Sequence, residues 1–140
     1  MARAENPCPW MNAATAAGFL GGEVSLTSTI KKPKEVVDRP QETGNCEFAR
    51  ISTPSTKLRI EVAIMEHSPR EDFAGYLDKC RSNVKALKAI GNEAVVCTWD
   101  VAARVVGRVR DQAFVITLTA PDVNPEKIRK AAEIVAGNLF

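Results

Sequence analysis

The fold is decided by LKAIGNEAVVCTWDVAARVVGRVRDQAFVITL, which spans Leu87–Leu118. The apolar runs Glu93–Trp99, Ala103–Val109 and Ala113–Thr119 predict three strands joined by two polar turns. A meander of this kind has an apolar face that other elements must cover. The flanking segments therefore have to supply that cover.

Three further strands are predicted ahead of the meander. Glu23–Ile30 alternates apolar and polar residues, Cys46–Ile51 follows it, and Lys57–Met65 has the most regular alternation in the chain. Between the first two lies Lys31–Gly44, where two prolines and seven charged residues predict a long charged loop. Long loops in compact domains are often functional, although a solvated connection between strands needs no function.

Helices are predicted at both ends of the chain. The alanines of Ala13–Leu20 favour a short helix, which Asn12 can cap and Gly21-Gly22 can end. Near the other terminus, Asn124-Pro125-Glu126 is typical of a helix start. The last helix then has an apolar stripe made of Ile128, Ala131, Ala132, Val135 and Leu139.

The middle helix has the clearest start signal. In Ser68-Pro69-Arg70-Glu71 the serine can cap, the proline suits the first turn and the glutamate completes a capping box. The following residues form an apolar stripe at helical spacing: Phe73, Tyr76, Leu77 and Cys80. This spacing turns Cys80 towards the core. Val84 and Leu87 continue it, so we expect the helix to run past Asn83.

These elements predict an α+β fold. Residues 1–140 form a single domain, in which a largely antiparallel sheet of about six strands is covered by three helices in the order α-βββ-α-βββ-α. There are no internal repeats and no regular alternation of strands and helices, so a parallel sheet is not expected.

Composition narrows the classes of protein that this chain can be. It has 140 residues, 45% of them apolar and 26% charged, which is typical of a globular domain. The net charge is +2 at pH 7, and no basic domain or acidic tail stands out, so we expect no nucleic-acid partner. No apolar run approaches the roughly 20 residues of a transmembrane helix, so no transmembrane segment is expected.

The first residues and the cysteines indicate an exported protein. Ala2-Arg3-Ala4 ahead of Glu5 is typical of the small-residue remnant of signal-peptide cleavage, with Met1 as an added start. We therefore expect residues 1–7 to be a flexible remnant and the protein to be secreted or periplasmic. Four cysteines, an even number, fit an oxidising compartment. A cytosolic protein with four buried thiols is the alternative.

Four cysteines allow three disulfide pairings. We favour Cys8–Cys46 with Cys80–Cys97, because each bond then ties one helix to a strand of the sheet. Chain-entropy estimates give about 4 and about 3 kcal/mol of stabilisation for loops of these lengths. A catalytic thiolate would need an electropositive site with a base nearby, and nothing places His67, the only histidine, beside a thiol. The cysteines are therefore interpreted as structural.

No catalytic, cofactor or metal motif is assembled in the sequence. A G-x-S-x-G elbow, a P-loop and a dinucleotide fingerprint are all absent, and one histidine cannot complete a zinc set of common spacing. We therefore expect no catalytic residue, no cofactor and no metal.

Two groups of side chains remain as candidate contacts. Arg104, Arg108 and Arg110 share parity in one predicted hairpin, so they could form a positive stripe that contacts an anion or a partner. A solvated outer face explains the same pattern without a ligand. Trp10 and Trp99 could line an apolar ligand pocket, whereas core packing explains both as well.

Five short stretches carry a family resemblance, in this order: Asn6-Pro7-Cys8-Pro9-Trp10, Phe19-Leu20-Gly21-Gly22, Cys46-Glu47-Phe48, Ile90-Gly91-Asn92-Glu93-Ala94-Val95 and Ala132–Leu139. Together they resemble a family of exported bacterial proteins of unknown function, many of them actinobacterial lipoproteins, with a PsbP-like α/β sandwich. The resemblance implies export, an antiparallel sheet covered by helices and a Cys8–Cys46 bridge. It implies no catalytic residues, and PsbP-like domains commonly dock onto partners. Cys8 lacks a lipobox context, and Cys80 and Cys97 lie outside the resemblance.

Three functional hypotheses follow. The first is an exported, non-catalytic domain that binds a protein or a small ligand through the sheet edge, the Lys31–Gly44 loop or the arginine stripe. The second is a hydrolase or lyase that uses His67 or Glu93. The third is a structural component of the cell envelope. The sequence predicts neither the specific ligand nor the oligomeric state.

Overall fold

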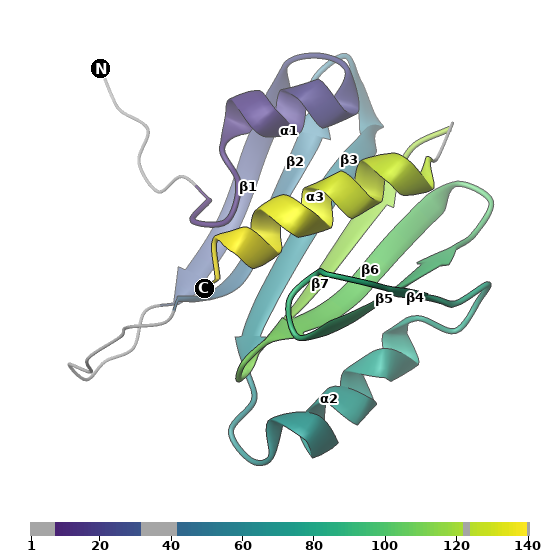
Figure 1. The fold of residues 1–140 in the computed structure, drawn as a ribbon. Coiled ribbons are helices and arrows are strands. Elements are labelled where there is room, and N and C mark those ends of the chain that lie inside the picture. Colours follow the sequence, from purple (N-terminus) through teal and green to yellow (C-terminus); the bar gives the residue numbers. More distant parts are fainter. Residues whose placement is uncertain (1–7, 32–41, 122–123, 140) are drawn as a thin grey trace.

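A single antiparallel sheet organises the chain (Figure 1). The computed structural model describes residues 8–31, 42–121 and 124–139, and within them seven strands lie in the order β1-β2-β3-β7-β6-β5-β4. Every neighbouring pair of strands is antiparallel. The strands are β1 (Val24–Lys31), β2 (Thr43–Arg50), β3 (Thr53–Ile64), β4 (Lys85–Leu87), β5 (Glu93–Thr98), β6 (Ala102–Val109) and β7 (Gln112–Thr119).

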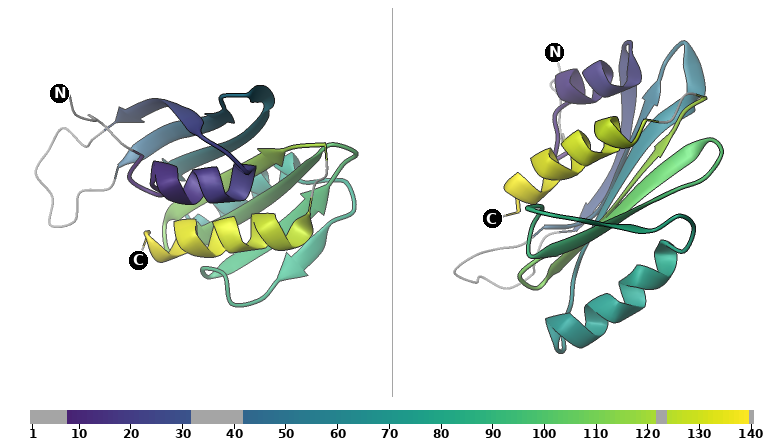
Figure 2. Two further views of the ribbon diagram at one scale, coloured as in Figure 1. Left: turned by 90° about the horizontal axis from the view of Figure 1, so that it is seen from above. Right: turned by 45° about the vertical axis from the view of Figure 1, so that its right-hand side comes forward.

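Helices cover both faces of this sheet unequally (Figure 2). On one face, α1 (Ala13–Leu20) lies over β1–β3 and α3 (Pro125–Gly137) lies over β5–β7. Among the helices of the described residues, the other face carries only α2 (Pro69–Tyr76), continued by the short 3-10 turn η1 (Leu77–Lys79). Since α2 packs against the β5–β7 half, it leaves that face uncovered by helices over β1, β2 and much of β3.

The α+β class, the antiparallel sheet and the three helices are as the sequence predicts. The number of strands was wrong by one, because the segment before the meander is not helical. Asn83 takes a left-handed backbone conformation with φ of 51°, and β4 then pairs with β5 at the edge of the sheet. The order is therefore α-βββ-α-ββββ-α.

The middle helix is also shorter and differently capped than expected. It ends at Tyr76, η1 follows, and Cys80 is already extended, so the helix does not run past Asn83. Ser68 makes no side-chain cap hydrogen bond. Instead, Asp72 Oδ2 accepts a hydrogen bond of 3.1 Å from the backbone N–H of His67. A carboxylate of the first turn therefore ties down the chain that enters the helix, in place of the predicted capping box.

Each face of the sheet has its own apolar core and its own disulfide. Under α1 and α3 the core includes Phe48, Phe114 and Ile128, and Cys8 bonds to Cys46 there. Under α2 a smaller core gathers around Phe73 and Val106, and Cys80 bonds to Cys97. These are the two pairings that the sequence favours, and Cys80 is buried as predicted, although it lies beyond the helix in extended backbone.

The segment predicted as a loop, Lys31–Gly44, is partly strand. Lys31 belongs to β1, and Thr43 and Gly44 belong to β2, where they pair with Lys31 and Ile30. Residues 32–41 of that loop and the predicted remnant, residues 1–7, lie outside the described residues.

The entry to the meander shows why its residues form a recognisable motif. Gly91 has a φ of 61°, and a Cβ there would lie 2.4 Å from the backbone oxygen of Arg108, so only glycine fits without a shift. Ile90 is buried, and the Asn92 N–H donates to that same Arg108 oxygen at 2.8 Å. The motif thus locks the chain onto β6 before β5 begins. No helix among the described residues combines the length and the apolarity needed to cross a membrane.

Candidate functional site

The face of the sheet that carries α2 presents polar side chains where the helix does not cover it. Strand register places one row of side chains across four strands, namely Thr29, Asn45, Glu61 and Val115. In the next row Lys31 lies beside Thr43, and Ala63 lies beside Ala113. The alternation of β-strands puts all of these on one face, opposite the apolar residues that pack under α1 and α3.

A groove of about 650 Å³ lies over these two rows. Its floor is formed by the two rows, and Tyr76 of α2 and Lys79 of η1 line it on the helical side. Such a volume is within the range of roughly 300–1,000 Å³ found for small-molecule sites. We name this cavity the α2 groove.

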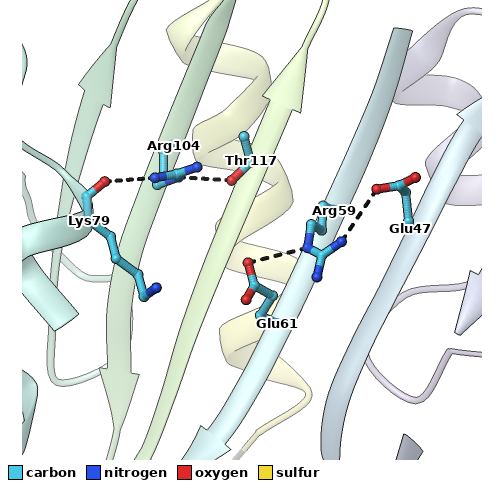
Figure 3. A network of polar contacts seen from close by, with 6 residues as sticks. All are labelled: Glu47, Arg59, Glu61, Lys79, Arg104 and Thr117. Atoms are coloured by element: carbon cyan, nitrogen blue, oxygen red, sulfur yellow. Dashed lines mark hydrogen bonds and ion pairs between the residues drawn. The ribbon is translucent and has the colours of Figure 1, made fainter. Parts of the chain in front are cut away.

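Four charged residues line the α2 groove: Lys31, Lys79, Glu61 and Glu66. Glu61 pairs with Arg59, whose Nε lies 3.4 Å from Glu61 Oε2 and whose Nη1 lies 3.6 Å from Glu47 Oε1 (Figure 3). Within the described part of the chain, the side chains of Lys31, Lys79 and Glu66 make no ion pair or hydrogen bond. Two ammonium groups are therefore available to a ligand.

Arg104 fixes the helical wall of the groove. Its Nη1 donates to the backbone oxygen of Lys79 at 2.8 Å, and its Nε donates to Thr117 Oγ1 at 2.9 Å (Figure 3). The guanidinium thus joins η1 to the middle of the sheet. On its other side it lies 5.0 Å from the centroid of the Trp99 ring.

The predicted arginine stripe is only partly assembled. Arg104 and Arg108 do lie on the α2 face of β6, whereas Arg110 is in the turn to β7 with a φ of 57°. Arg108 Nε contacts Glu93 Oε2 at 2.6 Å, and its Nη1 donates to the Arg110 backbone oxygen at 3.0 Å. Since Arg104 and Arg108 already have hydrogen-bond partners, an anion would have to compete with them. Contact of the stripe with an anion or a partner stays a prediction.

The residues of the hydrolase hypothesis are not brought together. The side chain of His67 is 84% exposed, and its Nδ1 lies 3.6 Å from Asp72 Oδ2. Glu93 is held by Arg108, and neither residue lines the α2 groove. Among the residues that the structure describes, no group of three or more His, Cys, Asp or Glu side chains could hold a metal ion.

The two tryptophans have different environments. Trp10 is 2% exposed and belongs to the core under α1 and α3, and its backbone oxygen accepts a hydrogen bond from Asn138 Nδ2 at 2.8 Å. Trp99 is 40% exposed in the turn between β5 and β6. Core packing therefore explains Trp10 but not Trp99.

Sequence reasoning missed the residues of the α2 groove. Asn45, Glu61, Tyr76 and Lys79 come from three distant segments, and each fits a solvated strand or helix face. The alternation of β3 does place Glu61 on the polar face, but it does not show that α2 leaves Glu61 uncovered.

Comparison with known proteins adds little to this geometry. No family model and no curated protein matches the chain. Among solved structures, the chain is similar to a GTP-binding regulator from Thermotoga maritima, with 13% sequence identity, 94% of this chain and 92% of that chain covered, and a TM-score of 0.47. A likeness of this degree assigns no function.

Proposed function

We propose that this protein is an exported, non-catalytic binding domain of the PsbP-like type, and that it takes its ligand in the α2 groove. The single observation that carries the proposal is the groove itself, which has a floor of mixed polar and apolar side chains and two lysines without partners in the described residues. Export is supported by the two disulfides, which are typical of oxidising compartments.

The charges of the groove indicate the chemistry of its ligand. Lys31 lines it from the edge strand β1 and Lys79 from η1, so the two ammonium groups flank the floor. Asn45 supplies an amide, and the Glu61 carboxylate is balanced by Arg59. Among the lining charges without a partner in the described residues, the two ammonium groups outnumber the single Glu66 carboxylate. This arrangement suits a polar ligand with carboxylate groups that also forms hydrogen bonds, such as a short acidic peptide segment.

A binding role is also supported by what surrounds the groove. The disulfide Cys80–Cys97 and the two hydrogen bonds of Arg104 hold the helical wall in place. A wall that is fixed before binding reduces the ordering cost of association. No observation in the described residues favours the hydrolase or lyase hypothesis, because His67 and Glu93 both lie outside this cavity.

The test is a binding experiment on the whole chain under oxidising conditions. Short peptides rich in aspartate and glutamate, and the dicarboxylates succinate and glutamate, are titrated into 15N-labelled protein. We expect backbone amide shifts at Thr43–Asn45 and Tyr76–Lys79. The variant K31E/K79E should lose these shifts, since it reverses both ammonium charges while the Lys79 backbone oxygen still accepts from Arg104.

The matched control is K130E, a charge reversal on α3 at the opposite side of the sheet. It should bind as the wild type does. Shifts that gather outside the groove, or binding that K31E/K79E leaves intact, would refute the proposed site. If none of the probes binds at millimolar concentration, the hypothesis of a structural envelope component gains the support instead.

A further inference from the structure

An exposed tryptophan stands at a second, smaller cavity. Trp99 lies in the turn between β5 and β6, where its backbone N–H donates to the Ala102 backbone oxygen at 2.7 Å. The neighbouring Val101 is 54% exposed, although large apolar side chains are mostly buried in this sheet. Exposed apolar surface next to polar side chains is typical of a binding site.

The indole is held in one orientation by Arg104. The guanidinium carbon lies 5.0 Å from the ring centroid, in cation–π geometry, and the guanidinium is itself fixed by Thr117 and by the Lys79 backbone oxygen. One side of the ring is therefore occupied by protein. The exposed part of the ring borders a cavity of about 380 Å³.

The other wall of this cavity is also fixed before any ligand arrives. Ser82 and Asn83 line it, and two hydrogen bonds join them to β5: Thr98 N to the Ser82 oxygen at 3.2 Å, and Asn83 Nδ2 to the Thr98 oxygen at 3.3 Å. Just before them, Cys80 is bonded to Cys97 of the same strand. This disulfide, which lies outside the family resemblance, holds the loop beside Trp99.

The chemistry of the lining limits the ligand. An apolar surface, formed by the indole and Val101, lies next to the hydrogen-bonding side chains of Ser82, Asn83 and Asp100. A flat ligand with one apolar face and a rim of hydroxyl groups satisfies both parts. The pyranose ring of a sugar with equatorial substituents has this form, because each face of the ring presents only axial C–H bonds and the hydroxyl groups lie around the edge.

Charge favours a neutral ligand at this position. The Asp100 carboxylate lines the cavity without an ion-pair partner in the described residues, so it opposes an anion. A cation stacked on the open side of the Trp99 ring would be opposed by the charge of Arg104, which already contacts that ring. We propose that this cavity binds a pyranose ring of a neutral carbohydrate, stacked on Trp99 and hydrogen-bonded by Asp100 and Asn83.

This site is separate from the α2 groove. No described residue lines both cavities: Lys79, the last residue of η1, lines the groove, whereas Ser82 lines the smaller cavity. The carbohydrate site therefore stands or fails independently of the proposed function.

The test uses the intrinsic fluorescence of the whole oxidised protein. Trp10 is buried and Trp99 is exposed, so acrylamide quenching reports on Trp99. Cellotetraose and the tetrasaccharide of N-acetylglucosamine are the probes, since their equatorial substituents leave the faces of each ring free to stack. We expect saturable protection of Trp99 from acrylamide with at least one of them.

Variants decide whether the binding uses the proposed residues. Binding by the variants is measured by isothermal titration calorimetry, because W99A and W99F lack the fluorescent reporter. W99A should weaken binding at least about tenfold, W99F should retain most of it because a ring still stacks, and D100N should weaken it less than W99A. The control I51A removes another exposed apolar side chain, in the turn between β2 and β3, and should leave binding unchanged.

Three results would overturn the carbohydrate site. Failure of both oligosaccharides at millimolar concentration, or equal binding by W99A and the wild type, would overturn the proposal. Protection by tetramethylammonium chloride but by neither sugar would show a cation site and overturn it as well. Measurement of the acidic peptides in the same variants should show no change, which separates this site from the groove.

Discussion

Removal of the Cys80–Cys97 disulfide should affect stability and the Trp99 site together. The bond closes a loop with a sequence separation of 17 residues, whereas Cys8–Cys46 closes one with a separation of 38. On the chain-entropy estimate, these loops correspond to about 3 and about 4 kcal/mol. Each of these stabilisation energies is a large part of the roughly 5–15 kcal/mol of net stability typical of a domain.

The variants are C80A/C97A and C8A/C46A. Alanine is chosen because all four sulfur atoms belong to buried residues, and serine would add a buried hydroxyl that lacks a hydrogen-bond partner. Urea unfolding followed by circular dichroism gives the free energy of unfolding for each. We expect losses of about 3 and about 4 kcal/mol, with some additional cost for the lost packing of the sulfur atoms.

The two variants should differ in what they do to Trp99. Loss of Cys80–Cys97 frees the loop that carries Ser82 and Asn83, so acrylamide quenching of Trp99 should rise in the folded protein. Loss of Cys8–Cys46, on the opposite face of the sheet, should leave the quenching unchanged. The reasoning would be wrong if C80A/C97A lost less than about 1 kcal/mol, or if C8A/C46A changed the quenching as much.

Two further predictions concern residues whose roles the structure defines. A Cβ at Gly107 would lie 2.4 Å from Phe114 Cζ, so G107A should lower the free energy of unfolding by about 1–3 kcal/mol through overpacking. Adding F114L to G107A should restore part of that loss. Strictly additive effects of the two substitutions in urea unfolding would contradict this contact. Asn12 Oδ1 accepts from the Thr15 N–H at 2.7 Å, so N12A should cost about 1 kcal/mol, whereas S68A should cost less than about 0.5 kcal/mol because Ser68 makes no cap hydrogen bond. Equal thermal unfolding midpoints for N12A and the wild type would refute the prediction for Asn12. A large loss of stability in S68A would refute the prediction for Ser68.

The first helix and the three strands of the meander were predictable from the sequence. Ala13–Leu20 is helical with the bounds expected, and β5, β6 and β7 lie within one residue of their predicted bounds. These segments have strong local signals: an alanine-rich helix between a cap and two glycines, and apolar runs between polar turns. Local preference and tertiary packing agree there, so the pattern alone sufficed.

The segment after Tyr76 was not predictable in the same way. The predicted apolar stripe does pack in the smaller core, which includes Phe73 and Cys80 and contacts Tyr76 and Leu77. The helix nevertheless stops, because Cys80 is bonded to β5 and the chain then turns at Asn83 to add β4 to the sheet. A three-residue edge strand is too short to leave a periodic signal of its own.

The candidate sites depend on contacts that strand alternation does not contain. Lys31, Asn45 and Glu61 have the pattern of an ordinary solvated face, and a groove exists only because Tyr76 and Lys79 stand beside them. Coverage of a sheet is set by the length and docking of a helix, which the polarity of strand residues does not reveal.

Arg104 has structural contacts that the sequence does not indicate. Its parity on the α2 face suggests an anion contact, which stays a prediction; in the structure its Nε donates to Thr117, its Nη1 donates to the Lys79 backbone oxygen, and its guanidinium lies 5.0 Å from the centroid of the Trp99 ring. The same guanidinium therefore positions the wall of the α2 groove and orients the ring of the smaller cavity. Because α2 covers only half of the polar face, both cavities lie at the margins of the helical segment, and the charge-assisted hydrogen bond from Arg104 to the Lys79 backbone oxygen joins that segment to the sheet between them.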